Sequence, residues 1–414
     1  MAVTWCVVLL GVLLSIEAKP SCKFEDDSSR HLECSPGDSD YILDKGLVSD
    51  KARIVTIILR SCKITSLNTD CFEGLPRLER LDISHNKLTT LPLGVLDKVP
   101  KLTYFNASYN IITNLPVGLF KNVQNLIQLD LTGNHLYEIN PGLFKKVSLL
   151  YLSKNYLQGR DLHPNVFEIS DVNFLLLNEN DMTGAPENML RTLHELLYLN
   201  LDDCSLTEVP KFITTPNLDT ITHLTISNNK IREINEPIFD NLKDLEVLNL
   251  TMNLIDSLND NLFTSLKKLK KIDLSKNRLK TITEHQFQNT PFLTDINLSH
   301  NLISILPVNA FRASALNKLD ISNNRLTYLQ DNFCLELKNS GAVLRDFYFS
   351  ENPWQCACLH DLLREVKTLN LKYDDVNYDG GHPVCVSAGQ FVCNRQVYVN
   401  EVYLDMYHLI QERL

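Results

Sequence analysis

The chain has 414 residues and a formal net charge of −10 at pH 7. Its length alone predicts two or three domains. The acidic balance argues against broad nucleic-acid binding, which needs an extensive basic surface.

The first element, residues 1–18, is predicted to be a signal peptide that is cleaved near Ala18. Its apolar run, residues 7–14, is too short for a membrane anchor, and no other stretch of the chain is long and apolar enough to span a bilayer. We therefore expect a secreted, extracellular protein with no stable membrane insertion.

Residues 19–53 come next and contain Cys22 and Cys34. Disulfides are the default for cysteines in an oxidising compartment, so this pair is expected to be bridged. The segment is predicted to cover the open end of the repeated structure that follows it.

Residues 54–351 contain about twelve copies of one sequence pattern, L-x-x-L-x-L-x-x-N-x-L, which we call the repeated line. A degenerate thirteenth copy ends at Asn352. Cys62 and Cys204 replace the asparagine in two copies. The asparagine of the line falls on Asn86, Asn110, Asn134, Asn155, Asn180, Asn229, Asn253, Asn277, Asn301 and Asn324. This pattern indicates a leucine-rich repeat array, which overrides the prediction of several domains.

Each copy supplies one short strand, and stacked copies bury each other's leucines. The asparagine amide is expected to bond backbone groups at the bend after the strand. A second landmark is a phenylalanine in the return half, predicted to form a spine: Phe72, Phe120, Phe144, Phe167, Phe239, Phe263, Phe287, Phe311 and Phe333. The fold class is thus an α/β solenoid, a horseshoe with a parallel concave β-sheet and a disulfide cap at each end.

Side chains alternate along a strand, so the x positions beside the leucines point to the concave face. In the fifth to seventh copies these positions hold a set of large apolar residues, which we call the concave patch: Leu149, Tyr151, Phe174, Leu176, Leu197 and Tyr198. An exposed apolar patch of this kind marks an interaction site. The alternative is that the irregular lengths of these copies shift the strand register. Some of the residues would then turn inward, or an inserted loop would cover the patch.

Three N-x-[ST] sequons, at Asn106, Asn249 and Asn297, also fall on the concave face. Glycans there would obstruct the third, ninth and eleventh copies and leave the fourth to eighth copies bare. The sequons therefore confine a partner to the stretch that contains the concave patch.

Residues 352–394 are rich in cysteine, and residues 395–414 have the apolar periodicity of a short helix. The tail has two interpretations: a helix packed on the cap, or a dimer contact. Cys62 and Cys71 either form a bridge or stay reduced. Cys334 has no obvious partner within reach. It therefore either forms a disulfide-linked dimer or stays a buried free thiol.

The strands, the phenylalanine spine and "NPWQCAC" resemble extracellular leucine-rich repeat proteins, in particular Toll-like receptor ectodomains and the soluble immune proteins of insect haemolymph. The resemblance implies that Cys356 pairs with Cys385 and Cys358 with Cys393. It also implies recognition of a microbial glycolipid or of a protein partner, in innate immunity. The alternative is an extracellular matrix or adhesion scaffold that binds host proteins only.

No catalytic motif is present: the chain lacks G-x-S-x-G, a P-loop and H-E-x-x-H. The C-x-C spacing also argues against a zinc site. We expect no enzyme, no cofactor and no metal, and a binding function instead.

Overall fold

The computed structural model describes residues 19–24, 30–168, 170–234, 238–374, 384–387, 389, 391–396 and 400–411. The predicted signal peptide lies outside the described residues. No helix in the described ranges is long and apolar enough to cross a membrane.

The described elements are seventeen strands and three α-helices, with four short 3-10 helices. The strands are β1 (Ser21–Phe24), β2 (His31–Ser35), β3 (Tyr41–Leu43), β4 (Thr56–Ile58), β5 (Ile64–Leu67), β6 (Arg80–Asp82), β7 (Tyr104–Asn106), β8 (Gln128–Asp130), β9 (Leu149–Tyr151), β10 (Phe174–Leu176), β11 (Tyr198–Asn200), β12 (His223–Thr225), β13 (Val247–Asn249), β14 (Lys271–Asp273), β15 (Asp295–Asn297), β16 (Lys318–Asp320) and β17 (Asp346–Tyr348). The α-helices are α1 (Phe333–Asn339), α2 (Cys356–Thr368) and α3 (Asn400–Gln411), and the 3-10 helices are η1 (Gly159–Asp161), η2 (Lys211–Thr214), η3 (Pro216–Leu218) and η4 (Val308–Phe311).

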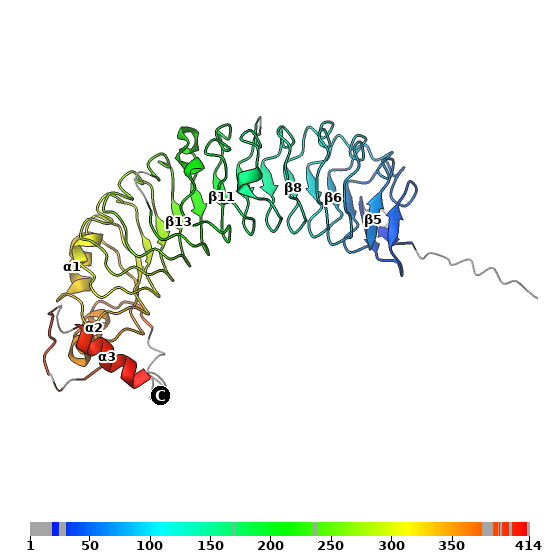
Figure 1. Ribbon diagram of the computed structural model, residues 1–414. Helices are drawn as coiled ribbons and strands as arrows, with labels where there is room; N and C mark the ends of the chain where they lie inside the picture. The colour runs from blue at the N-terminus through cyan, green and yellow to red at the C-terminus, as the bar shows by residue number, and fades with distance from the viewer. Residues whose placement is uncertain are drawn as a thin grey trace, which may run out of the picture.

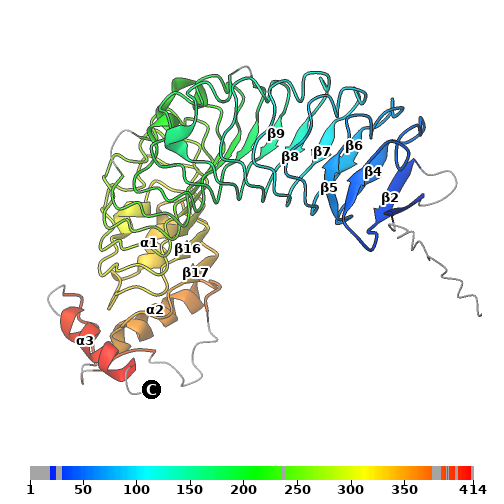
Figure 2. The same cartoon turned by 45° about the vertical axis from the view of Figure 1, so that its right-hand side comes forward.

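One fifteen-stranded sheet runs through the whole arch (Figure 1). Its first pair, β1 and β2, is antiparallel, and every later neighbour from β2 to β17 is parallel. Figure 2 shows β2 and β4 at one end of the arch and α2 and α3 at the other. This is the predicted solenoid, with an antiparallel hairpin added at its N-terminal end.

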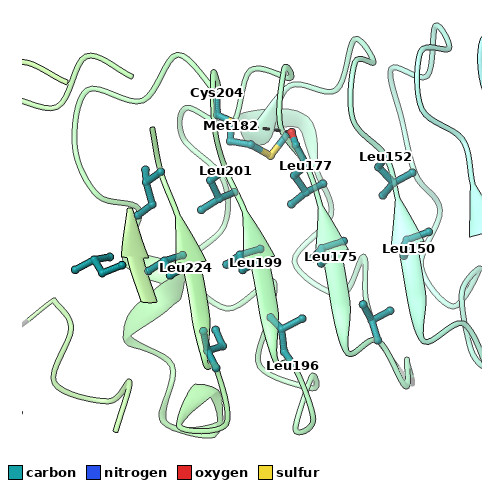
Figure 3. Packing of buried hydrophobic residues seen from close by; sticks show 14 of the residues in the cluster. Leu150, Leu152, Leu175, Leu177, Met182, Leu196, Leu199, Leu201, Cys204 and Leu224 are labelled. Atoms are coloured by element: carbon teal, nitrogen blue, oxygen red, sulfur yellow. Dashed lines mark hydrogen bonds between the residues drawn. The ribbon is translucent and has the colours of Figure 1, made fainter. Parts of the chain in front are cut away.

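The core forms because each three-residue strand points its middle side chain inward. Leu150, Leu175 and Leu199 are fully buried and lie in one row, one per strand (Figure 3). The residues on either side of each middle residue point outward, as alternation along a strand requires. The sheet therefore offers two rows of side chains on its concave face.

The asparagines form the backbone hydrogen bonds predicted for them, and Asn110 is an example. Its Oδ1 accepts a hydrogen bond from the backbone N–H of Leu88 at 3.0 Å, in the preceding copy. Its Nδ2 donates to the carbonyl oxygens of Ile83, at 3.1 Å, and Ala107, at 3.0 Å. One buried side chain thus satisfies backbone groups of two neighbouring copies at the bend, where no strand partner is available.

The phenylalanine spine is also present. Phe263, Phe287 and Phe311 stack with ring centroids 5.7 and 5.8 Å apart. All nine predicted members are buried, although Phe120 is the most exposed of them, at 9%.

Disulfides close both ends of the solenoid. Cys22 is bonded to Cys34 across the β1–β2 hairpin. At the C-terminal end, Cys356 is bonded to Cys385 and Cys358 to Cys393, which ties α2 to the segment after it. These are the pairings expected from the sequence and from the resemblance.

The tail forms α3, which packs on the C-terminal cap (Figure 2). Tyr403 and Tyr407 are buried in a cluster with Val386, and the Thr327 hydroxyl donates a hydrogen bond to Asn400. These contacts agree with the interpretation of the tail as a packed helix.

Four cysteines, Cys62, Cys71, Cys204 and Cys334, are free and buried. The expected alternative of a Cys62–Cys71 bridge is therefore wrong. Cys334 lies within α1 and is only 1% exposed, which favours a buried free thiol. The dimer through Cys334 stays a prediction.

Candidate binding surface

The concave patch lies on β9, β10 and β11, whose registers place its members in two rows. Leu149 aligns with Phe174, and Phe174 aligns with Tyr198. In the second row, Tyr151 aligns with Leu176. Aligned positions on adjacent strands are about 4.8 Å apart, so these side chains are neighbours.

The sheet keeps its register through this region, even though the copies have irregular lengths. β8 pairs with β9, β9 with β10 and β10 with β11, and each middle residue aligns with the next middle residue. The alternative, in which a register shift turns patch residues inward, is therefore wrong. Phe174 remains 38% exposed on the concave face.

Leu197 differs from the other members because it precedes β11 rather than lying within it. Its side chain is 38% exposed and sits beside the strand-initial row. The residue that continues the second row from Leu176 is Asn200. Leu197 is thus a rim residue, and the second row of the patch ends at β10.

A stack of planar side chains forms the centre of the surface. The ring of Tyr198 lies between Phe174 and His223, with centroids 5.7 Å from the first and 6.0 Å from the second. His223 begins β12 and aligns with Tyr198. The sequence analysis missed His223, although its position in the repeated line is the same as that of Tyr198.

Burial changes the acidity of the two tyrosines. Desolvation raises the pKa of Tyr151, and the nearby Asp130 carboxylate raises it further. Desolvation also raises the pKa of Tyr198, with a smaller contribution from Asp202. Both phenols therefore stay neutral at physiological pH and keep a hydroxyl proton that they can donate to a partner.

Polar residues flank the patch, including the three sequon asparagines. Asn106, Asn249 and Asn297 each end a strand, on β7, β13 and β15, in the row that contains Tyr151. The amide of Asn297 donates to Asp273 at 3.0 Å, and its Oδ1 accepts the N–H of Ser299 at 3.1 Å. The sequons thus lie on the concave face on both sides of the patch, as predicted, and their occupancy stays a prediction.

Several surface hollows lie away from the patch. Their volumes are about 350 to 470 Å³, and they lie on the outer turns, on the loops that follow the strands and on the C-terminal cap. Within the described part of the chain, no group of three or more His, Cys, Asp or Glu side chains could hold a metal ion.

A family model described as leucine rich repeat matches residues 52–112, 219–279 and 267–326. The chain is a leucine-rich repeat solenoid. Residues 113–218, which hold the concave patch, lie between the matched segments of the solenoid.

Solved leucine-rich repeat structures share this fold. A chain of the Toll–Spatzle complex of Drosophila matches with a TM-score of 0.65 and 22% identity, over 80% of this chain and 50% of that chain. A leucine-rich repeat protein of Leptospira interrogans matches with a TM-score of 0.60 and 21% identity, over 78% and 90% of the two chains. The LRIM1/APL1C complex matches with a TM-score of 0.53 and 19% identity, over 87% and 64%. No curated protein sequence matches the chain.

Proposed function

We propose that the protein is a secreted recognition protein that binds a protein partner through its concave patch, in innate immunity. The observation that carries the proposal is the stack of Phe174, Tyr198 and His223 on an open sheet face. Aromatic residues on a rigid element contribute more to interface energy than other residues do. Stacked rings also lose little conformational freedom when a partner binds.

The shape of the patch favours a protein over a glycolipid. An acyl chain is best accommodated in a concave, mostly apolar cavity. The patch stands on the open surface of a sheet, where the side chain of Phe174 is 38% exposed. A protein can cover such a shallow surface with its own side chains.

Secretion is supported by the predicted signal peptide and by the three disulfides, because disulfides persist in oxidising compartments. The immune role is supported by one solved structure of the same fold, a chain of a complex described as a molecular hub in Drosophila development and innate immunity. The LRIM1/APL1C complex is a second structure of the same fold. Both are assemblies with protein partners.

Site-specific photo-crosslinking tests the proposal. A benzophenone side chain would replace Phe174 in one protein and Phe292, an exposed residue between β14 and β15, in a matched control. Each would be incubated with extracellular fluid of the source organism, before and after microbial challenge. The proposal expects a protein adduct from position 174 alone, displaced by excess parent protein. Equal adducts from both positions, or a lipid adduct at 174, would contradict it.

A further inference from the structure

One copy of the repeat is three residues shorter than the copy before it. Asn110 and Asn134 are 24 residues apart, whereas Asn134 and Asn155 are only 21 apart. The sequences of the two segments match at first. Gly118-Leu119-Phe120-Lys121 corresponds to Gly142-Leu143-Phe144-Lys145, and Val123 corresponds to Val147. Gln124, Asn125 and Leu126 then have no counterpart before the next strand.

The shortening falls on the outer side of the solenoid. Gln128 still aligns with Leu149 across β8 and β9, so the sheet is unaffected. One core residue is missing: Val123 and Leu126 are both buried shortly before β8, whereas Val147 is the one buried residue at this place before β9. Removing a buried leucine from a stack leaves a cavity when the surroundings do not collapse.

The structure contains a hollow at this place. It has a volume of about 350 Å³ and lies between the outer turns that precede β8 and β9. Its apolar lining includes Phe120, Val123, Leu126, Leu143 and Val147. The volume is within the range of small-molecule sites, about 300 to 1,000 Å³.

The phenylalanine spine is disturbed beside the hollow. Phe120 is 9% exposed, whereas Phe144 is fully buried. The ring of Phe120 therefore lacks part of the packing that the regular segments provide.

Charge is the second distinguishing property of the hollow. Its lining includes Lys121, Lys145 and Lys146 and no Asp or Glu. Lys146 forms an ion pair with Asp171 at 3.1 Å. Lys121 and Lys145 are exposed, occupy equivalent places in adjacent segments, and have no ion pair among the described residues. Two unpaired ammonium groups beside an apolar floor attract an anion, even on a chain whose net charge is −10.

We propose that this hollow binds a small amphipathic anion. The apolar body of the ligand would rest on Phe120, Val123 and Leu126. Its carboxylate, sulfate or phosphate head would bind Lys121 and Lys145. This site is separate from the concave patch and does not depend on the proposed function of that patch.

Calorimetric titration of the full secreted chain with octanoate tests this proposal. We expect saturable binding of one octanoate per chain, and binding at least roughly tenfold weaker for acetate, which lacks the apolar body, and for octylammonium, which has the wrong charge. Lys121→Glu combined with Lys145→Glu should abolish octanoate binding. Phe174→Ala combined with Tyr198→Ala, on the concave face, should leave it unchanged.

Two further variants make the test specific. Lys98→Glu with Lys101→Glu changes two exposed lysines on the preceding outer turn, where the segment has its full length, and should keep octanoate binding. Inserting Gln-Asn-Leu between Val147 and Ser148 restores the missing residues and should fill the hollow and remove binding. The proposal is overturned if octanoate does not saturate, or if the Lys121 and Lys145 variant, with an unchanged melting temperature, binds like the parent.

Discussion

Phe174 and Tyr198, one on β10 and the other on β11, stack with their ring planes within 14° of each other. Their strands fix this geometry, since the two residues align across the parallel pair. The rings are therefore ordered before any partner arrives. A preordered aromatic pair loses less entropy on binding than two freely rotating side chains.

The asparagine ladder predicts a large and local stability loss. Asn110→Ala leaves the buried N–H of Leu88 without its acceptor. It also removes one hydrogen bond to each of the carbonyls of Ile83 and Ala107, which keep the bonds that they accept from Asn86 and Asn134. An unsatisfied buried N–H costs about 1–3 kcal/mol and a lost hydrogen bond about 1 kcal/mol, so we expect a loss of roughly 3 kcal/mol in urea unfolding.

Cys204→Ala is the matched control, because Cys204 occupies the same place in its copy. The Cys204 thiol has one hydrogen to donate, and its two possible acceptors are distant: the carbonyl oxygens of Leu177 at 3.4 Å and Asp202 at 3.5 Å. We expect a loss of about 1 kcal/mol for this change. Equal losses of stability in the two variants would show that the asparagine amide stabilises the fold no more than the thiol does.

The two C-terminal disulfides are expected to stabilise the fold more than the N-terminal one. Cys358 and Cys393 are 35 residues apart in sequence, whereas Cys22 and Cys34 are 12 apart, and closing a longer loop removes more entropy from the unfolded chain. Replacing Cys358 and Cys393 by serine should lower stability by about 2–5 kcal/mol and reduce secretion. Serine at Cys22 and Cys34 should have the smaller effect on the melting temperature. The reverse order would contradict this account.

Buried thiols predict that the protein loses stability in alkali. Desolvation by burial raises the pKa of the Cys204 thiol from 9.0 to about 12, and that of Cys62 to about 11. Below pH 9 these thiols are neutral in both states and have no effect. Above pH 9 the unfolded chain ionises first, so the folded state loses stability as the pH rises toward 11.

At pH 10 each thiol should lower the stability by about 1 kcal/mol relative to neutral pH. Urea midpoints of the parent and of Cys204→Ala, measured at pH 7.5 and pH 10, check this value. The variant should lose less stability than the parent between the two conditions. Identical losses would mean that Cys204 does not titrate in this way.

Glycans at the sequons are expected to border the partner without touching it. Asn249 ends β13, and its row reaches Tyr151 only after β12, β11 and β10. Asn249→Gln should therefore leave partner affinity unchanged or improve it. Mass spectrometry of the secreted protein should find glycans at Asn106, Asn249 and Asn297, and an affinity loss in Asn249→Gln would place the partner over this part of the sheet.

The repeated line predicted the sheet because each of its fixed residues has one structural role. An inward leucine such as Leu175 and a slot residue such as Asn110 leave the strand a single orientation. The antiparallel β1–β2 hairpin could not be predicted, because β1 carries no copy of the line. For Cys334 the sequence left two interpretations open, a bridge between chains and a buried thiol, because the repeat pattern does not predict the helix α1 that contains it.

The irregular copies show where the pattern misleads. Their lengths raised the alternative of a register shift on the concave face. The structure instead absorbs the three missing residues on the outer side, beside Phe120, because a shift in the sheet would turn every inward leucine toward solvent. The concave patch was therefore predictable from alternation, whereas the hollow required the packing of two neighbouring segments.

The central claim is that the concave patch carries partner binding. The most direct measurement is the affinity of the crosslinked partner for Phe174→Ala combined with Tyr198→Ala, compared with Tyr137→Ala combined with Tyr156→Ala, two exposed tyrosines outside the patch. A central interface residue contributes at least about 2 kcal/mol, or roughly thirtyfold in affinity, so the first variant should lose all measurable binding and the control should lose none. Parent-like affinity in the first variant, at an unchanged melting temperature, would contradict the account.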